Sequence, residues 1–326
     1  MKTLEEAELC FPQLFNSSCR KPMRPHALSM LSYILLSFIS LLTMTLNLLV
    51  IISISHFKQL HTPTNLLLLS LAVSDFLVGF LIFFQIMLID GCWLFGDLMC
   101  VIYNVLDFII TSASIGTMVL IAVDRYVAIC YPLHYANKVT EKRVQVCVCL
   151  CWICSALLHS LLLKNNLEQP GRYNSCLGEC VLVINYIAGL ADLLLSFIGP
   201  VTLIIVLYMR VFVVAVTQAR AMRSHIAALP LKRSEAKKSE LKAARTLGVV
   251  IVVFLLCICP YYCVSLTGQD TLSNVSSVAF VIYLFYFNSC LNPVIYAYFY
   301  PWFRKSIKFI VTLKILQPGS YAADII

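Results

Sequence analysis

Long hydrophobic runs alternate with short polar stretches along this chain. A helix that spans a lipid bilayer needs about 20 mostly apolar residues. Seven runs meet that length, at residues 30–56, 65–89, 98–130, 144–163, 181–217, 246–266 and 275–299. The third and fifth runs are longer than a bilayer requires, so they should tilt or project beyond it. The pattern predicts an all-α membrane protein, a bundle of seven transmembrane helices.

The segments at the two ends of the chain differ from the spans. Residues 1–27 are polar and hold no apolar core, so they lack the pattern of a cleavable signal peptide. Residues 302–313 are too few to span and carry basic residues on one side, which predicts an amphipathic helix at the membrane surface. The domains expected from this division are an outer segment at 1–28, the seven-helix bundle at 29–300, and the amphipathic helix with a tail at 301–326.

The composition agrees with lipid as the solvent and partner. Of 326 residues, 60% are hydrophobic and only 12% are charged, whereas soluble domains carry roughly 25% charged residues. The net charge of +8 does not indicate nucleic acid, because the basic residues form short clusters between hydrophobic runs without interleaved aromatic residues.

Lys and Arg gather on one side of the predicted spans, and this bias predicts the orientation in a plasma membrane. Most of the 24 basic residues fall in segments that would be cytoplasmic if the N-terminus is outside the cell. These segments are 57–64, 131–143, 218–245 and the tail after 299. The glycosylation tripeptides at Asn16 and Asn274 would then both lie outside, in agreement.

Location divides the 15 cysteines into two groups. Nine lie in or near the spans with no His or carboxylate beside them, and there Cys is favoured as a small apolar residue over a metal ligand. Six lie in segments expected outside the cell, where disulfides form: Cys10, Cys19, Cys92, Cys100, Cys176 and Cys180. A bridge from the start of the third span to the loop before the fifth would hold that loop over the mouth of a pocket.

Three acidic residues lie at membrane depth, where an ionisable side chain indicates function: Asp75, Asp107 and Asp192. Asp107 stands about two helical turns after Cys100, at the outer end of its span. Its carboxylate stays charged there only if a cation or several donors compensate it. It either forms a hydrogen bond between helices, with Tyr286 as a partner, or binds the ammonium group of a ligand. The cost of burying the charge favours the ligand.

Asp192 lies about two turns before Pro200, with no basic residue near it in sequence. If Asp192 and Asp107 face one cavity, their charges repel unless a dication lies between them. A ligand with two amines would compensate both. The alternative is that Asp192 is protonated or bonded to a neighbouring hydroxyl group.

Asp75 lies deep in the second span, where Asn47, Ser114, Asn288 and Ser289 are expected to approach it. A cluster of oxygen atoms at this depth suits a small cation such as sodium. A polar network that links the helices would use the same residues, and the two interpretations are compatible.

Several motifs, in the right order and spacing, resemble the rhodopsin-like family of G-protein-coupled receptors. Asp124-Arg125-Tyr126 ends the third span, and Asn292-Pro293-Val294-Ile295-Tyr296 ends the seventh. Residues 288–303, NSCLNPVIYAYFYPWF, and residues 52–65, ISISHFKQLHTPTN, resemble the trace amine-associated receptors more closely. The family's two outer disulfides would correspond to Cys100–Cys180 and Cys19–Cys176, with Cys10 as the alternative to Cys19.

The resemblance implies an amine ligand. Asp107 would be the amine-binding aspartate, and Asp192 corresponds to a second acid found in some fish members. Receptors with both acids are thought to recognise diamines such as cadaverine or putrescine. The aromatic residues implied around the ligand are Phe108, Tyr261, Tyr262 and Tyr286. Their ring faces suit alkylammonium groups, although ordinary helix packing accounts for each of them equally well.

The resemblance also implies how the receptor is activated. At rest Arg125 would pair with Asp124 and Glu240, and it would be released as the sixth helix swings outward. The other residues with implied roles are Tyr126, Tyr208, Asn292, Pro293 and Tyr296 in switching, Ile115, Pro200 and Phe254 as the connector beneath the pocket, and Pro132 and Leu133 as G-protein contacts. The sequence departs from the family at Ile258, where a Trp usually lies under the ligand.

The implied partners are a small amine and a heterotrimeric G protein of the stimulatory or olfactory type, which raises cAMP, in olfactory sensory cilia. The nearest alternative is a monoamine receptor in which Asp192 is structural. An amine or cation transporter would use the same acids, but no repeat or broken helix pair supports it. No motif supplies a nucleophile with its base, so the chain is not predicted to be an enzyme. Sodium is the one ion that the sequence suggests, and no other cofactor is expected.

Overall fold

The computed structural model describes residues 8–14, 16–21, 26–224, 231–267 and 275–325, without the side chains of 90, 218–245 and 265–279. Within this part of the chain, seven helical spans are long and apolar enough to cross a membrane, which confirms the predicted bundle. Six of them belong to α1 (His26–His56), α2 (Pro63–Met87), α3 (Gly96–Cys130), α5 (Glu141–Leu162), α9 (Leu231–Thr267) and α10 (Val275–Phe299). The fifth span in chain order consists of α7 (Tyr186–Asp192), η4 (Leu193–Ile198) and α8 (Gly199–Ser224).

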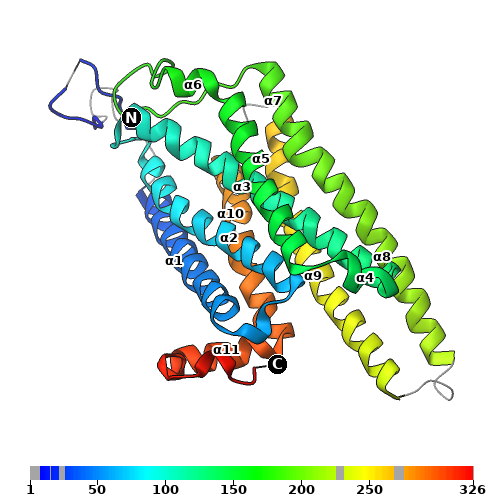
Figure 1. Ribbon diagram of the computed structural model, residues 1–326. Coiled ribbons are helices and arrows are strands. Elements are labelled where there is room, and N and C mark those ends of the chain that lie inside the picture. The colour runs from blue at the N-terminus through cyan, green and yellow to red at the C-terminus, as the bar shows by residue number, and fades with distance from the viewer. Residues whose placement is uncertain (1–7, 15, 22–25, 225–230, 268–274, 326) are drawn as a thin grey trace.

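Figure 1 shows these helices side by side, with the N-terminal segment at one end of the bundle and α11 (Pro301–Val311) lying across the other. We call the first of these the N-terminal end. Two short helices join the spans, α4 (Pro132–Lys138) after α3 and α6 (Lys164–Glu168) after α5. The predicted amphipathic helix at 302–313 is confirmed as α11, which ends at Val311 because the chain turns at Leu313, with φ of 56°.

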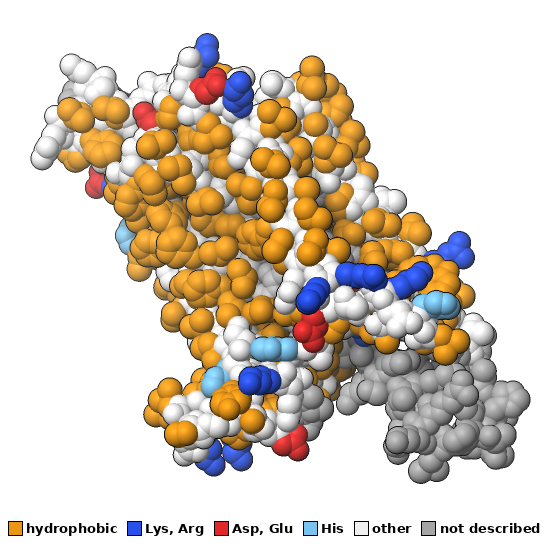
Figure 2. Space-filling view, in the orientation of Figure 1, with side chains coloured by type: hydrophobic (Ala, Val, Ile, Leu, Met, Phe, Trp, Pro, Cys, Tyr) orange, Lys and Arg blue, Asp and Glu red, His pale blue; other side chains and the backbone are white. Residues whose placement is uncertain are grey.

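The outside of the bundle is apolar over its middle. Figure 2 shows hydrophobic side chains covering this zone, with charged side chains gathered toward the two ends. Large side chains such as Phe38, 60% exposed, and Leu157, 66% exposed, point outward from the helices. An apolar surface of this extent is stable in lipid, as the composition predicted.

The fifth span begins later than predicted, and its first five expected residues are not helical. The side chain of Asn166 forms two hydrogen bonds with the backbone of Val183. It donates to the carbonyl oxygen at 2.9 Å and accepts from the N–H at 3.3 Å. Asn185 then caps the helix, because its Oδ1 accepts from the N–H of Ala188 at 2.7 Å. Side chains distant from a hydrophobic run therefore decide where its helix begins.

The fifth span also contains a π-helical turn, η4, immediately before Pro200. Proline has no N–H to donate, and its ring collides with the carbonyl four residues earlier. A widened turn accommodates both effects, and such turns occur often at functional sites. Asp192 is the residue that precedes the turn.

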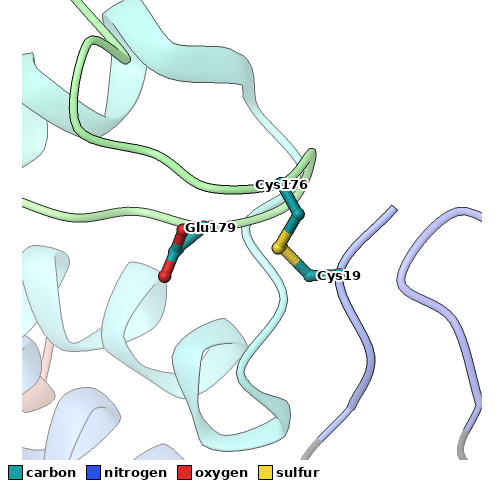
Figure 3. Close-up of side chains that lie close together, drawn as sticks. All are labelled: Cys19, Cys176 and Glu179. Atoms are coloured by element: carbon teal, nitrogen blue, oxygen red, sulfur yellow. A yellow bond between two sulfur atoms is a disulfide. The ribbon is translucent and has the colours of Figure 1, made fainter. Parts of the chain in front are cut away.

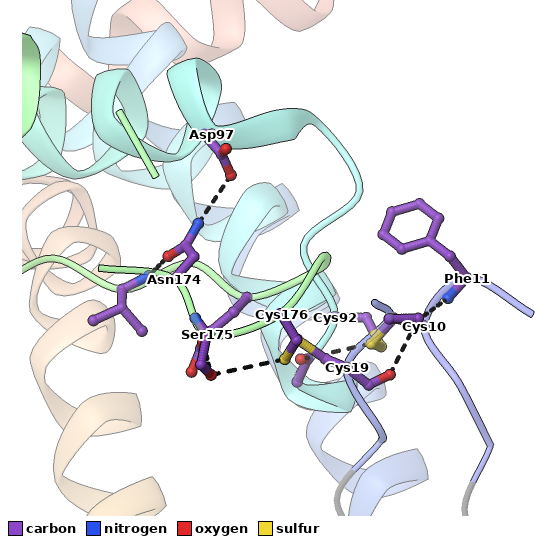
Figure 4. Close-up of a disulfide and its surroundings, with 12 residues drawn as sticks. Cys10, Phe11, Cys19, Cys92, Asp97, Asn174, Ser175 and Cys176 are labelled. Atoms are coloured by element: carbon purple, nitrogen blue, oxygen red, sulfur yellow. Dashed lines mark hydrogen bonds between the residues drawn. A yellow bond between two sulfur atoms is a disulfide. The ribbon is translucent and has the colours of Figure 1, made fainter. Parts of the chain in front are cut away.

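Three disulfides close the N-terminal end, among them the two pairs that the resemblance implied. Cys100 is bonded to Cys180 and Cys19 to Cys176. The third, Cys10–Cys92, was not predicted, and it shows that the alternative of Cys10 replacing Cys19 is wrong. Figure 4 shows the N-terminal segment bonded through Cys19 to Cys176 in the loop before α7 and through Cys10 to Cys92, which precedes α3.

Two backbone hydrogen bonds also join the N-terminal segment to the loop before α7. Cys19 N donates to Leu177 O at 2.9 Å, and Leu177 N donates to Ser17 O at 2.7 Å. Glu179 in the same loop accepts from the N–H and hydroxyl of Ser175, which holds the pKa of its carboxyl below the usual value. Figure 3 shows Glu179 beside the Cys19–Cys176 bond. This group is not a metal site, because both sulfur atoms are bonded to each other rather than present as thiolates.

Candidate ligand-binding site

A cavity of about 340 Å³ opens between α3, α9 and α10 at the N-terminal end of the bundle. Five of the predicted ligand residues lie on its wall: Asp107, Phe108, Tyr261, Tyr262 and Tyr286. Cys180 also lines it, so the Cys100–Cys180 disulfide holds part of the cavity wall in place. The disulfide between the start of the third span and the loop before the fifth span therefore lies at the cavity, as the sequence predicted.

Asp107 carries the acidic charge of this cavity. None of the ion pairs among the described residues includes its half-buried carboxylate. The alternative of a hydrogen bond to Tyr286 is not found among the described residues, and the nearby Tyr103 hydroxyl donates to Gln85 at 2.6 Å instead. A carboxylate at membrane depth without a protein cation leaves room for a cation from a ligand.

Aromatic rings form much of the surrounding wall. The ring of Tyr261 lies 4.9 Å from that of Phe285 and 5.4 Å from that of Tyr262, centroid to centroid. Tyr262 stacks on Phe197 at 3.8 Å with an interplanar angle of 9°. Tyr262 therefore has both of the roles considered from the sequence, because it packs against Phe197 and also lines the cavity. Aromatic faces of this kind attract alkylammonium groups.

Asp192 does not lie on the cavity wall. Its Oδ1 lies 3.7 Å from Nδ1 of His159 on α5, with the His159 side chain 2% and the Asp192 side chain 16% exposed. This basic partner is distant in sequence, and His159 was not predicted. The signal was available, because a His inside the hydrophobic run 144–163 is an ionisable residue at membrane depth like the three acids.

Comparison with known proteins agrees with this architecture. Residues 46–296 match the family of 7 transmembrane receptors (rhodopsin family). The chain is 37% identical to trace amine-associated receptor 13c of Danio rerio, covering 97% of this chain and 95% of that protein. It is 35% identical to trace amine-associated receptor 4 of Mus musculus, with 98% and 96% covered, and 39% identical to mouse trace amine-associated receptor 1, with 88% and 90% covered. The chain belongs to the trace amine-associated receptors.

As a trace amine-associated receptor, the protein is a multi-pass plasma-membrane receptor for small amines that acts through heterotrimeric G proteins. Its family is one of receptors and not of enzymes. The similarity to receptors extends over nearly the whole chain, which favours a receptor over the transporter that the sequence left as an alternative.

In this receptor, Arg125 lies in a closed polar cluster at the end opposite the cavity. Its Nε donates to Asp124 Oδ2 at 3.0 Å and its Nη2 to Thr64 Oγ1 at 2.6 Å. Asp124 also accepts from Thr64 at 3.0 Å and from the Tyr135 hydroxyl at 2.8 Å. Thr64 and Tyr135 were not predicted. The implied partner Glu240 falls in α9, where its side chain lies outside the described residues.

The other residues of this end are placed as follows. Tyr208 and Tyr296 have buried hydroxyls without a hydrogen-bond partner among the described residues. Tyr126 packs its ring against Tyr131 at 5.7 Å. Pro132 and Leu133 begin α4, and Leu133 is 86% exposed at the surface.

The receptor's central core contains the implied connector. Ile115 and Phe254 are buried in one cluster with Ile258, which fills the place of the expected Trp with a small aliphatic side chain. Pro200 is the second residue of α8, and Pro293 lies within α10. Ile258 has no aromatic face and no indole N–H, whereas Tyr261 and Tyr262, further along α9, line the cavity.

Asp75 joins the second and seventh spans of the receptor. Its Oδ2 accepts from Asn292 Nδ2 at 2.8 Å, while its Oδ1 is buried without a partner. The Oδ1 atoms of Asn288 and Asn292 are likewise buried without partners among the described residues, and Ser114 is also buried. Unpartnered oxygen atoms are the ligands that a small hard cation takes, so these residues fit sodium.

Proposed function

We propose that this receptor binds small diamines of the cadaverine and putrescine type. One ammonium group would pair with Asp107 and the other would be drawn to Asp192. The observation that carries the proposal is that Asp107 lines the cavity, while Asp192 lies one side chain behind its wall. Asp192 is 3.7 Å from His159, and the ring of His159 is 5.6 Å from that of Phe108, which lines the cavity with Asp107. Two carboxylates so near to one cavity favour a ligand with two positive ends.

The proposal includes the direction and the place of signalling. We infer that the N-terminal end faces the outside of the cell, because its disulfides require an oxidising compartment. Arg125, Pro132 and Leu133 then face the cytoplasm, where the partner would be a stimulatory G protein that raises cAMP. The resemblance to trace amine-associated receptors supports olfactory sensory cilia as the location. Antibody labelling of an N-terminal epitope on intact cells tests the orientation.

Asp192→Asn should weaken the response to cadaverine and spare monoamines, because it removes the second charge without changing the size of the side chain. Charge-assisted hydrogen bonds contribute about 1.5–3 kcal/mol, so the cadaverine EC50 should rise about 10- to 100-fold. The measurement is cAMP in cells that carry equal receptor at the surface, with pentylamine as the monoamine of matched length. An unchanged cadaverine curve would favour the alternative, a monoamine receptor in which Asp192 is structural.

Sodium should lower the potency of the agonist, because the cation stabilises the resting arrangement around Asp75. Replacing potassium by sodium at constant ionic strength should weaken agonist binding about fivefold or more, the usual lower range of coupling between sites. Asp75→Asn should abolish this difference. Asp97→Asn, which lies at the start of α3 away from the cluster, should retain it. Equal sodium sensitivity in both variants would exclude Asp75 as the site.

A further inference from the structure

His159 and Asp192 form a pair of ionisable side chains that the family motifs do not include. His159 comes from α5 and Asp192 from the end of α7, and their nearest atoms lie 3.7 Å apart. Among the described ion pairs, this is the only one that involves either residue. Both side chains are largely shielded from solvent and lipid. Asp192 therefore has one possible source of positive charge within the protein, as far as its side chains are described.

The same histidine reaches the wall of the amine cavity. Its ring lies 5.6 Å from that of Phe108, centroid to centroid, at an angle of 34°. Phe108 follows Asp107 on α3 and lines the cavity with it. His159 thus touches a residue of the cavity on one side and the second acid on the other. Its Nε2 atom is buried without a hydrogen-bond partner, so Nδ1 is the atom through which it acts.

This arrangement bears on whether Asp192 can attract an ammonium group. A carboxylate at membrane depth keeps its charge only when a donor or a cation compensates it. Oδ1 of Asp192 is buried without a hydrogen bond to any described residue, and Nδ1 of His159, which can carry a proton, lies 3.7 Å from it. Without His159, no described side chain would hold this oxygen beside the cavity, and the carboxylate could turn away from the second ammonium of a diamine.

We propose that His159 is a positioning residue that holds the Asp192 carboxylate beside the amine cavity and thereby sets the preference of the receptor for diamines over monoamines. The proposal rests on the diamine function argued above. It assigns the selectivity to a contact between the fourth and fifth spans, outside the cavity itself.

The test compares two substitutions of the same residue. His159→Phe keeps a ring against Phe108 but removes the donor, and it should raise the cadaverine EC50 about tenfold or more while the pentylamine EC50 stays within about twofold. His159→Asn places an amide N–H near the position of Nδ1 and should restore most of the cadaverine potency. The readout is the ratio of the two EC50 values at equal surface expression. Should His159→Phe not reach the surface, His159→Leu takes its place.

A double-mutant cycle separates this proposal from the one on which it rests. In the Asp192→Asn background, His159→Phe should add no further loss for cadaverine, because its only target is gone. Three results would overturn the role of His159. The ratio of the cadaverine and pentylamine EC50 values could be unchanged in His159→Phe, both amines could lose potency equally, or His159→Asn could be as weak as His159→Phe. If Asp192→Asn itself leaves cadaverine unaffected, the diamine function fails, whereas a loss in Asp192→Asn without one in His159→Phe overturns the role of His159 alone.

Discussion

Asp107→Asn should abolish the cAMP response to every amine, monoamines and diamines alike. The substitution preserves the shape of the side chain but removes the negative charge of the cavity, which no described basic side chain compensates. Leaving one partner of a buried ion pair without the other costs about 3–5 kcal/mol, which corresponds to a loss of potency of at least about 100-fold. The measurement is a full dose–response curve for cadaverine and pentylamine.

The matched control is Asp97→Asn on the same helix. The Asp97 carboxylate accepts a hydrogen bond from Asn174 at 2.9 Å and does not line the cavity, so its EC50 values should remain those of the original receptor. If Asp107→Asn reaches the surface and still responds to pentylamine with normal potency, the ammonium does not bind at this carboxylate. A loss for diamines alone would contradict the assignment of Asp107 as the acid common to all amines.

Removing the Cys100–Cys180 disulfide, by replacing both residues with Ser, should destabilise the receptor and open its binding site. The bond closes a loop with a sequence separation of 80. A crosslink of this length lowers the entropy of the unfolded chain, which stabilises the folded receptor by about 4–5 kcal/mol. Cys180 also lines the cavity, so its loop would no longer be held over the ligand. We expect a lower Tm of the purified protein and an amine EC50 raised about tenfold or more.

The Cys10–Cys92 disulfide supplies an internal comparison. Its sequence separation of 82 is nearly the same, so loop closure alone predicts a similar loss of thermal stability. It lies away from the cavity wall, and its removal should leave the amine EC50 within about threefold. Equal changes of EC50 in the two double variants would mean that Cys100–Cys180 affects binding only through overall stability.

The fold could be predicted because hydrophobic runs long enough to cross a bilayer are typical of transmembrane helices and rare in soluble proteins. The residues at which the helices begin and end were predicted less accurately. The fifth span was expected to begin in an apolar stretch that Asn166 holds extended through the backbone of Val183. The hydrophobicity of a stretch does not reveal which distant side chain will compete for its backbone hydrogen bonds.

The site shows the same division between local and distant information. Asp107 was predicted from its place in the third span, and the tyrosines were implied by the family resemblance. The structure brings these residues from α3, α9 and α10 to one cavity. The pairing of Asp192 with His159, and that of Asp124 with Tyr135, joins residues from different helices. One sequence contains no direct signal for such pairs. The Cys10–Cys92 bond was missed for a similar reason, because spacing alone does not select partners among six cysteines.

The π-helical turn η4 fixes the direction in which the second acid faces. Each residue of an α-helix turns the chain by about 100°, so a turn that holds one residue more offsets everything before it relative to everything after it. Asp192 precedes the turn, whereas the G-protein end of the fifth span follows it. Deleting one residue from η4 would rotate Asp192 by about 100° away from His159 while the remainder of the span kept its packing. In this family, the length of a single helical turn could therefore change the spectrum of amines a receptor detects without any substitution in the cavity.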